Sequence, residues 1–569
     1  MQCLPCGFGT LRRKALRRLR ELWGIFAFCP PDGRQTRFAL PQSDFCAPRQ
    51  GRRRPPARGG PAHSAFQRRC AQPLRILCTE YTGPRLWFGR FHGKLKTRMC
   101  GRRSAGMRPG VPERKCAGVL KNFTKQEKSW MMYDWANSAH SVIVVTILPI
   151  FYNTVVEYMA DAASGMTTWG YATSAAMAIV ALLAPVMGVF GDFRGMRKKL
   201  FAIFMLVGVV SCVGLAVTPQ LDFMAPGVAE KVGMAVLALY ILSTIGFAGA
   251  NLYYDSFLND VTTEERMDKV STMGYGLGYI GGSTIPLLAF LIMNLILGSD
   301  AMLFCLSFAF GLTAVWWFVF SFPLLKNVEQ VSYVEREKGA VGKALKGLWA
   351  TVKEIFHHKE MFVFLIAYFF YIDGVNTIIH MSTSYGDTLG LDSTSMLLAL
   401  LLVQVLGLPF CLLYIKASER FGARAMVGVG ICIYMGVTVF GFFLREVWQF
   451  WVMAVMVATS QGGIQALSRS MFGKMIPDKK RTGEFFGFYD IFGKFSAIMG
   501  PALVGWSSAL AAGIMLKNAG ETRATASEAL LAQVNMDAAP WGILSVLIIF
   551  FIGGGLYFFV LPKYRKKKG

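Results

Sequence analysis

The chain has 569 residues, of which 54% are hydrophobic and only 17% are charged, whereas soluble domains carry about a quarter charged residues. From Trp130 onward the apolar residues gather into runs of about 20 or more, each long enough to cross a bilayer core of ~30 Å. This pattern excludes a soluble enzyme. The formal net charge of +26 comes mostly from the first 115 residues, so it says little about the partners of the remaining chain.

Residues 1–120 form a basic segment that differs from everything after it. The segment has Arg clusters, scattered Pro, Gly and Cys, and no sustained periodicity. Three interpretations are open: a basic arm for anionic lipid or nucleic acid, an organelle-targeting peptide, and an upstream region translated from a start codon placed too early. We favour the third, a disordered or misassigned extension, and expect no nucleic-acid partner. The alternative start codons are Met99, Met107 and Met131.

The apolar runs predict an all-α integral membrane protein with twelve transmembrane helices. Connections between the runs are short, except for a charged linker at 325–360 and a mixed loop at 513–539. After the extension, the predicted domains are a six-helix half at 121–324, the cytoplasmic linker at 325–360, and a second six-helix half with a basic tail at 361–569. The predicted spans are 131–156, 167–189, 199–218, 232–253, 271–296, 301–324, 361–383, 394–415, 424–444, 447–468, 484–512 and 540–561.

The loop charges predict an orientation. Lys and Arg gather in every second connection and in the two flanking segments, and they are scarce in the connections between. Positively charged loops stay on the cytoplasmic side of a membrane, so both termini are predicted to be cytoplasmic.

Three groups of residues recur in the same order in the two predicted halves. Two lie in corresponding helices, and one lies in the loop after the second helix of each half. Such matches at corresponding places indicate a six-plus-six duplication. The groups are Asp192, Gly195 and Arg197 with Glu419, Gly422 and Arg424; Asp134, Asn137 and Ser138 with Asp373, Asn376 and Thr377; and Gly278 and Pro286 with Gly493 and Pro501.

The repeated acid-Gly-Arg loop resembles the signature of the major facilitator superfamily. The motif Tyr-Asp-Trp-Ala-Asn-Ser at 133–138 resembles, more narrowly, the autophagy-related vacuolar amino-acid effluxer family and its bacterial relatives, as do 256–260, 276–282 and 483–487. The resemblance covers about 121–562. It implies a twelve-helix fold with a central cavity that opens alternately to each side, and amino-acid export for eukaryotic members. The short loops resemble the bacterial members, so we expect a bacterial cytoplasmic (inner) membrane.

The paired loops are candidates for a gate at the cytoplasmic side. Acid and Arg side chains at helix ends can pair with each other and with a neighbouring helix N-terminus, and a gate must loosen such contacts when it opens. The alternative is a plain positively charged loop with a Gly turn. The gating candidates are Asp192, Arg194, Gly195, Arg197, Glu419, Arg420, Gly422 and Arg424.

Acidic residues inside the spans are candidates for proton coupling. Asp373 lies near the middle of the seventh span, where a charge costs ~2.5–3.5 kcal/mol on insertion scales. It should therefore be paired, protonated or in contact with water, which suits a group that takes up and releases protons. The alternative for Asp373, Asp134, Asp255 and Asp490 is structural pairing between helices. Lys494, one turn from Asp490, is its candidate partner.

Polar residues on the central helices are candidates for the lining of a cavity. Gln461, Gln465 and Arg469 recur at i, i+4 and i+8 and so share one helix face. Arg469 could attract a substrate carboxylate or snorkel to the interface, and hydrogen bonding that holds helices together is the alternative for the whole set. The candidates are Asp134, Asn137, Ser138, Asn251, Tyr254, Asp373, Asn376, Gln404, Gln461, Gln465 and Arg469.

These features predict a secondary active or facilitative transporter that moves a small polar solute by alternating access. Amino-acid efflux is one interpretation. The glycines at 274, 278 and 282 predict close helix packing rather than a nucleotide loop, because no strand precedes them. We expect no enzyme activity, cofactor or metal, and we expect a monomer whose partners are the lipid bilayer, the solute and protons. The alternative function is a non-transporting membrane receptor or scaffold on the same fold.

Overall fold

The computed structural model describes residues 122–159, 162–225, 227–335, 340–523 and 525–564; the basic extension lies outside them. Within these residues, twelve helical segments are long and apolar enough to cross a membrane, as the sequence predicts. Their outer faces expose large apolar side chains such as Leu182 and Phe559, both 73% exposed. The protein is therefore an all-helical, multi-pass integral membrane protein.

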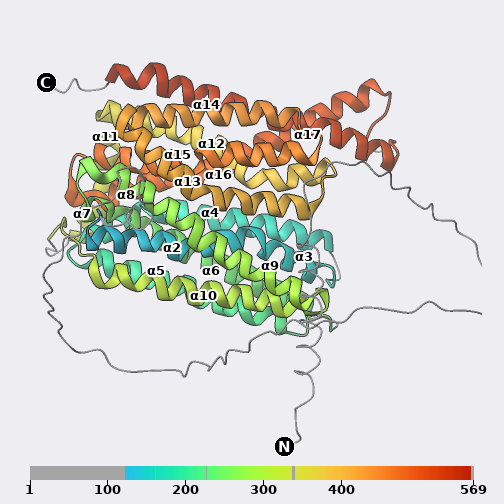
Figure 1. The fold of residues 1–569 in the computed structure, drawn as a ribbon, viewed down its shortest axis with the longest axis horizontal. Helices are drawn as coiled ribbons and strands as arrows, with labels where there is room; N and C mark the ends of the chain where they lie inside the picture. The colour runs from blue at the N-terminus through green and yellow to red at the C-terminus, as the bar shows by residue number, and fades with distance from the viewer. Residues whose placement is uncertain (1–121, 160–161, 226, 336–339, 524, 565–569) are drawn as a thin grey trace, which may run out of the picture. The chain divides into compact units, whose positions relative to one another are not determined.

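The helices run side by side in two groups (Figure 1). The first group, blue to green, and the second, yellow to red, correspond to the two predicted halves. The first six spans are α2 (Lys125–Thr146) with α3 (Leu148–Val156), α4 (Ala162–Asp192), α5 (Met196–Val217), α6 (Ala229–Ser256) with α7 (Leu258–Val261), α8 (Glu264–Leu277) with the π-helical η2 (Gly278–Thr284) and α9 (Ile285–Leu297), and α10 (Met302–Asn327). The second six are α12 (Lys359–Thr388), α13 (Ser393–Phe421), α14 (Ala423–Phe442), α15 (Val447–Met475), α16 (Thr482–Asn518) and α17 (Glu528–Gly555).

Helix ends differ from the expected spans where polar residues continue a helix. The mixed loop expected at 513–539 is wrong for most of its length: α16 runs on to Asn518, and α17 begins at Glu528, where Ser527 caps it by accepting from the Leu530 amide. These extensions pack against each other through a small cluster of Ala512, Leu516, Val534 and Ala538. Their sequences contain strong helix formers but are too polar for a hydropathy criterion to include them.

Each half has its own apolar core. One large cluster, which includes Phe364, Tyr371 and Phe550, comes mostly from α12–α17, with a contribution from α11 (Ala340–His357) of the linker. Two further clusters, around Trp317 and Phe310, belong almost wholly to α2–α10. Because each half buries its own core, polar and close-packed contacts between the halves can change without unfolding either half.

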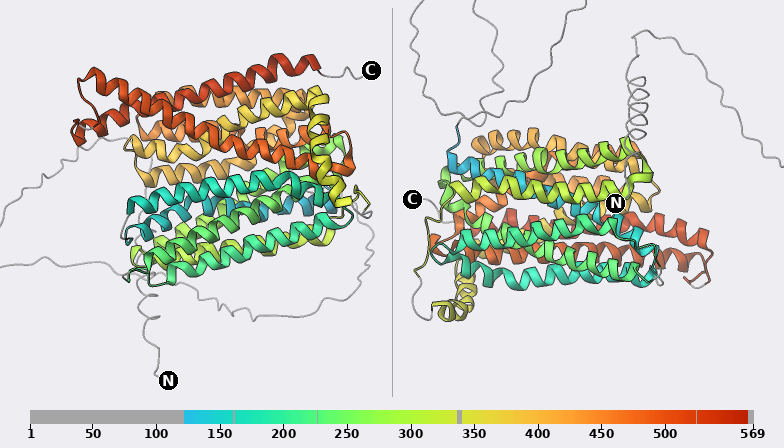
Figure 2. Two further views of the ribbon diagram at one scale, coloured as in Figure 1. Left: turned by 180° about the vertical axis from the view of Figure 1, so that it is seen from behind. Right: turned by 90° about the horizontal axis from the view of Figure 1, so that it is seen from below.

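The linker between the halves contains one more helix, α11 (Ala340–His357). Figure 2 shows it, in yellow, lying crosswise over the ends of the second-half helices. Just before it, the backbone of Val334 pairs with Asp192 and Arg194 in the loop after α4. The predicted cytoplasmic linker thus covers the ends of both halves.

The glycine stripe at 274, 278 and 282 packs directly against α2. A Cβ on Gly274 would lie 2.4 Å from Oδ2 of Asp134, and one on Gly278 would lie 2.6 Å from Oγ of Ser138. A Cβ on Gly281 would overlap the Trp135 ring at 2.0 Å. The prediction that this stripe permits close helix packing is confirmed.

Candidate functional site

Arg197, at the start of α5, is fully buried between two carboxylates. Its Nη2 lies 2.7 Å from Oδ1 of Asp192 and its Nη1 lies 2.5 Å from Oδ2 of Asp260. Nη1 also donates to the carbonyl oxygen of Ser256, at 3.3 Å. The loop turn itself depends on Gly195, whose φ of +69° is in the left-handed region. The sequence predicted that acid and Arg side chains of this loop pair, without fixing which ones, and it did not predict the contact with Asp260.

Asp192 also links the two halves. Its Oδ1 accepts from the amide of Gly483 at 2.7 Å and its Oδ2 accepts from the amide of Glu484 at 2.8 Å. These amides belong to the first turn of α16, where the unpaired N–H groups and the helix dipole favour a negative charge. One carboxylate of the first half therefore caps a helix of the second half.

Glycines allow α4 and α16 to approach closely beside this cap. A Cβ on Gly188 would lie 2.2 Å from the carbonyl oxygen of Gly483, and one on Gly487 would lie 2.7 Å from that of Ala184. Any larger residue at these positions would push the helices apart.

The same end of the second half is tied to the linker helix. Arg481 pairs with Glu484 at 2.9 Å and with Glu354 of α11 at 2.7 Å. Thr351 of α11 donates to Glu484. The start of α16 is thus held from one side by Asp192 and from the other by α11.

Further polar contacts between the halves lie near this predicted cytoplasmic end. They join the start of α8 to the end of α15, to Lys479 just after it, and to Glu419 near the end of α13. Three are ion pairs and one is a hydrogen bond. They are Lys474–Asp268 at 2.7 Å, Lys479–Glu264 at 3.3 Å, Lys269–Glu419 at 3.4 Å, and Ser470 Oγ to Asp268 Oδ1 at 2.7 Å.

The loop after α13 does not reproduce the buried network of its counterpart. The side chain of Glu419 is 58% exposed and that of Arg420 lies over the Phe421 ring. Gly422 has a φ of +85°, and the Arg424 carbonyl accepts from the Tyr557 hydroxyl. Arg194 of the first loop is also peripheral, since it forms an exposed pair with Glu335 at 3.2 Å.

Arg469 of α15 is buried and reaches across to the first half. Its Nη1 lies 2.9 Å from Oδ1 of Asp255, and its Nη2 lies 3.3 Å from Oδ2 of Asp134. Nε donates to Oγ of Ser271, and Nη2 to the Ser271 carbonyl oxygen. The side chain is only 4% exposed, so the snorkelling interpretation of Arg469 is wrong.

Three aromatic rings surround the same guanidinium. Its carbon lies 4.8, 5.3 and 4.6 Å from the ring centroids of Trp130, Tyr254 and Tyr275. Trp130 stacks on Tyr254 and donates to its carbonyl oxygen, and the Tyr254 hydroxyl donates to Oδ2 of Asp134 at 2.7 Å. We call Trp130, Asp134, Tyr254, Asp255, Ser271 and Tyr275 the cation cage.

Three cavity candidates near the cage are engaged with one another or with their own helix. Asn137 donates to Asn251 at 2.6 Å, which joins α2 to α6. Ser138 donates to the carbonyl oxygen of Asp134, one turn earlier. These contacts are the hydrogen bonding between and within helices that was the alternative to cavity lining.

Asp373, on α12 of the second half, is fully buried. Its Oδ1 accepts from the amide of Gly500 at 2.9 Å, and a Cβ on Gly500 would collide with Thr377. Oδ2 of Asp373 has no hydrogen-bond partner among the described residues.

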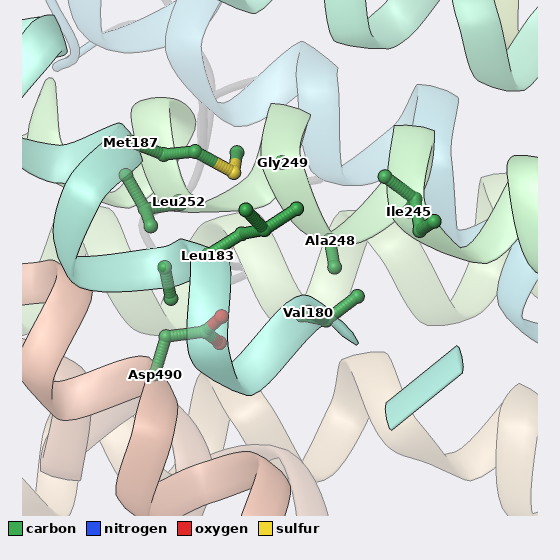
Figure 3. Close-up of a pocket in the computed structure, with 9 residues that line it drawn as sticks. Val180, Leu183, Met187, Ile245, Ala248, Gly249, Leu252 and Asp490 are labelled. Atoms are coloured by element: carbon green, nitrogen blue, oxygen red, sulfur yellow. The ribbon is translucent and has the colours of Figure 1, made fainter. Parts of the chain in front are cut away.

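Asp490 of α16 faces an apolar pocket between α4 and α6 (Figure 3). The pocket is lined by residues such as Val180, Leu183 and Leu252. Lys494, one turn along, lies 3.8 Å from Oδ1 of Asp490, as the sequence spacing predicts.

The remaining candidates share partial burial. Asn376, Gln404 and Gln465 are partly exposed, and Gln461 is 9% exposed. Gln461, Gln465 and Arg469 lie on one continuous helix, α15, as expected.

The sequence analysis included Tyr254 among the cavity candidates but missed the other two aromatic members of the cage, Trp130 and Tyr275. Trp130 and Tyr275 lie in apolar runs, where aromatic residues are ordinary packing residues. The cage residues lie in or next to the first, fourth and fifth predicted spans, which is the only signal in the sequence. No spacing along the chain relates them to Arg469.

Comparison with known proteins agrees with this architecture. Residues 124–508 match the family model described as vacuole effluxer Atg22 like. The Bacillus subtilis protein named uncharacterized MFS-type transporter YxiO is 45% identical over 392 residues, which are 68% of this chain and 89% of the relative. Autophagy-related protein 22-2 of Aspergillus niger is 24% identical over 449 residues, 68% of this chain and 72% of the relative.

Two solved structures have the same fold at low identity. A bacterial homologue of the human lysosomal transporter Spinster has a TM-score of 0.52 and 16% identity, covering 78% of this chain and 98% of that one. The human organic anion transporter MFSD10 has a TM-score of 0.50 and 12% identity, covering 79% and 100%. The chain belongs to the Atg22-like vacuole effluxer family and is a membrane transporter of the major facilitator superfamily, not an enzyme.

Proposed function

We propose that this transporter moves a small polar solute by alternating access, with amino-acid efflux as its physiological direction. The observation that carries the proposal is the contact between separately packed halves at the predicted cytoplasmic end, above all the Asp192 cap on α16. Polar and glycine-mediated contacts of this kind can break and re-form as rigid halves rock. When these contacts part, a cavity that opens to the side of the membrane opposite the predicted cytoplasmic end would close.

The chemistry at the interface supports a charged or zwitterionic solute. Asp134 and Asp255 lie together with Arg469 between the halves, and these carboxylates offer partners for the ammonium group of an amino acid. The family match to a vacuole effluxer supports export.

The predicted orientation completes the proposal. The ends of α4, α6 and α15 that carry the Lys- and Arg-rich loops form the cytoplasmic face, so that both termini are cytoplasmic. The bacterial relative YxiO supports a bacterial cytoplasmic membrane.

Proton coupling through Asp373 provides the energy in this proposal. A buried carboxylate with one backbone hydrogen bond is costly to keep charged, so its proton occupancy should change with exposure to water. The gradient of the solute itself is the alternative driving force.

Counterflow in proteoliposomes tests the function. The purified full-length protein is reconstituted into vesicles loaded with an unlabelled amino-acid mixture, and uptake of labelled amino acids is followed. We expect transient accumulation that protein-free vesicles do not show. Exchange of no solute, with correctly folded protein, would favour the receptor or scaffold alternative. If exchange is observed, metabolite profiling of a deletion strain would identify the physiological solute.

A further inference from the structure

We propose that the cation cage is the binding site for the ammonium or guanidinium group of the transported solute, and that Arg469 occupies it when the predicted cytoplasmic end is closed. The inference rests on the proposed transport function and adds the chemical class of the solute. It concerns a site at which a residue of the protein and the solute compete.

Every polar or aromatic group that the cage presents attracts a cation. Asp134 and Asp255 supply carboxylate oxygens, and Ser271 supplies its hydroxyl and carbonyl oxygens. Trp130, Tyr254 and Tyr275 supply ring faces, which attract cations within about 6 Å of the centroid. Aromatic faces combined with carboxylates are suited to amines and guanidines, and they repel anions.

All six cage residues belong to the first half, on α2, α6 and α8, whereas Arg469 is on α15 of the second half. Separation of the halves at this end must therefore withdraw Arg469 from the cage. Asp134 and Asp255 would then lose the cation that both contact, and two neighbouring like charges without a cation are unfavourable. A solute cation that enters the cage would offset this cost and so stabilise the open state.

In the closed state one side of the cage stays exposed while Arg469 occupies it. Two carboxylates face one guanidinium, and the side chain of Asp255 is 24% exposed. Four of the five N–H donors of Arg469 are engaged by cage oxygens, so Arg469 has little capacity left for a solute carboxylate.

Chemical rescue tests the cage without a known solute. Arg469→Ala empties the cage, and methylguanidinium or methylammonium chloride at millimolar concentration should refill it. We expect a saturable rise of about 1–3 °C in the unfolding midpoint at tenfold above half-saturation, compared with sodium chloride at equal ionic strength. The Arg469→Ala/Asp255→Asn double variant should lose the rise.

Arg266→Ala is the matched control. Arg266 also pairs with a carboxylate, Glu127, and lies near one ring, Phe123, but its side chain is 39% exposed and lies outside the cage. We expect no saturable rise for this variant. An equal response of Arg469→Ala to sodium and to methylguanidinium, or an equal rise in the double variant, would overturn the proposal.

A second measurement uses the wild-type protein and does not depend on the folding of Arg469→Ala. Counterflow is measured with labelled leucine, lysine, putrescine, succinate and glucose. We expect exchange of amine-bearing solutes only, with at least a tenfold loss in Asp255→Asn. Exchange of succinate or glucose without any amine would overturn the inference and leave the transport function standing. Exchange of none would count against the transport function, and the rescue experiment would still decide the cage.

Discussion

The two loops that the duplication relates have the same residue pattern and different surroundings. Asp192 is buried, pairs with Arg197 and caps α16, whereas Glu419 is 58% exposed and pairs with Lys269 at 3.4 Å. A repeated motif therefore does not imply a repeated interaction. The two loops should differ in energetic importance by several kcal/mol, since buried and exposed ion pairs differ by about that amount.

The linker explains much of the difference. The Val334 amide donates to the carbonyl oxygen of Asp192 at 2.8 Å, and Gln330 donates to that of Gly191 at 3.1 Å. This strand-like segment covers the start of the first loop, where Gly191, Asp192 and Phe193 are buried. In the second loop the side chain of Phe421 is 63% exposed.

Asp192→Asn should have the largest effect of the loop substitutions. It keeps the shape but removes the charge that compensates Arg197 and caps α16. Breaking a buried pair costs about 3–5 kcal/mol, so we expect a clear fall in the unfolding midpoint and loss of solute exchange. Differential scanning fluorimetry and counterflow measure these two effects. Asp222→Asn, at an exposed site, is the control, and equal midpoints for the two variants would contradict the buried network.

Gly188→Ala should have the next largest effect. The added Cβ would lie 2.2 Å from the Gly483 carbonyl oxygen, so α4 and α16 must separate at a cost of about 1–3 kcal/mol. We expect the predicted cytoplasmic end to open more often, measured as faster maleimide labelling of a cysteine introduced at Lys479. Gly505→Ala is the control, because a Cβ there meets nothing within 4 Å. Equal labelling rates in the two variants would contradict this role of Gly188.

The sequence alone predicts features that are local in the chain, but it does not predict contacts between distant segments. Twelve spans follow from hydropathy, and acid–Arg pairing in the first loop follows from the presence of both residue types there, although the choice of Arg197 comes from the structure. The partners of Arg469 do not follow from the sequence, because Asp134 and Asp255 lie more than 200 residues earlier and nothing local marks them. Asp134 and Asp373 occupy corresponding places in the two halves, but the first is paired with Arg469 and the second accepts from a backbone amide.

The variants Asp373→Asn and Asp134→Asn test whether the two aspartates have different roles. Asp373→Asn should keep exchange of an identified solute but abolish its acceleration by an imposed pH gradient, since the proposed proton carrier is gone. Asp134→Asn should lower exchange itself, since it weakens the cage. The readout is solute flux in proteoliposomes with and without the gradient. An unchanged gradient response in Asp373→Asn would remove the coupling assignment.

Glu419→Gln should have the smallest effect. The Glu419–Lys269 pair is partly exposed at both ends and 3.4 Å long, and such pairs contribute about 0–1 kcal/mol and are screened by salt. We expect an unfolding midpoint close to that of the wild type and exchange reduced by less than about threefold, with the remaining difference vanishing at high ionic strength. A loss as large as that of Asp192→Asn would mean that the second loop becomes buried in another state of the transport cycle. The two loops would then be equivalent gates that take turns, rather than one gate and one exposed copy.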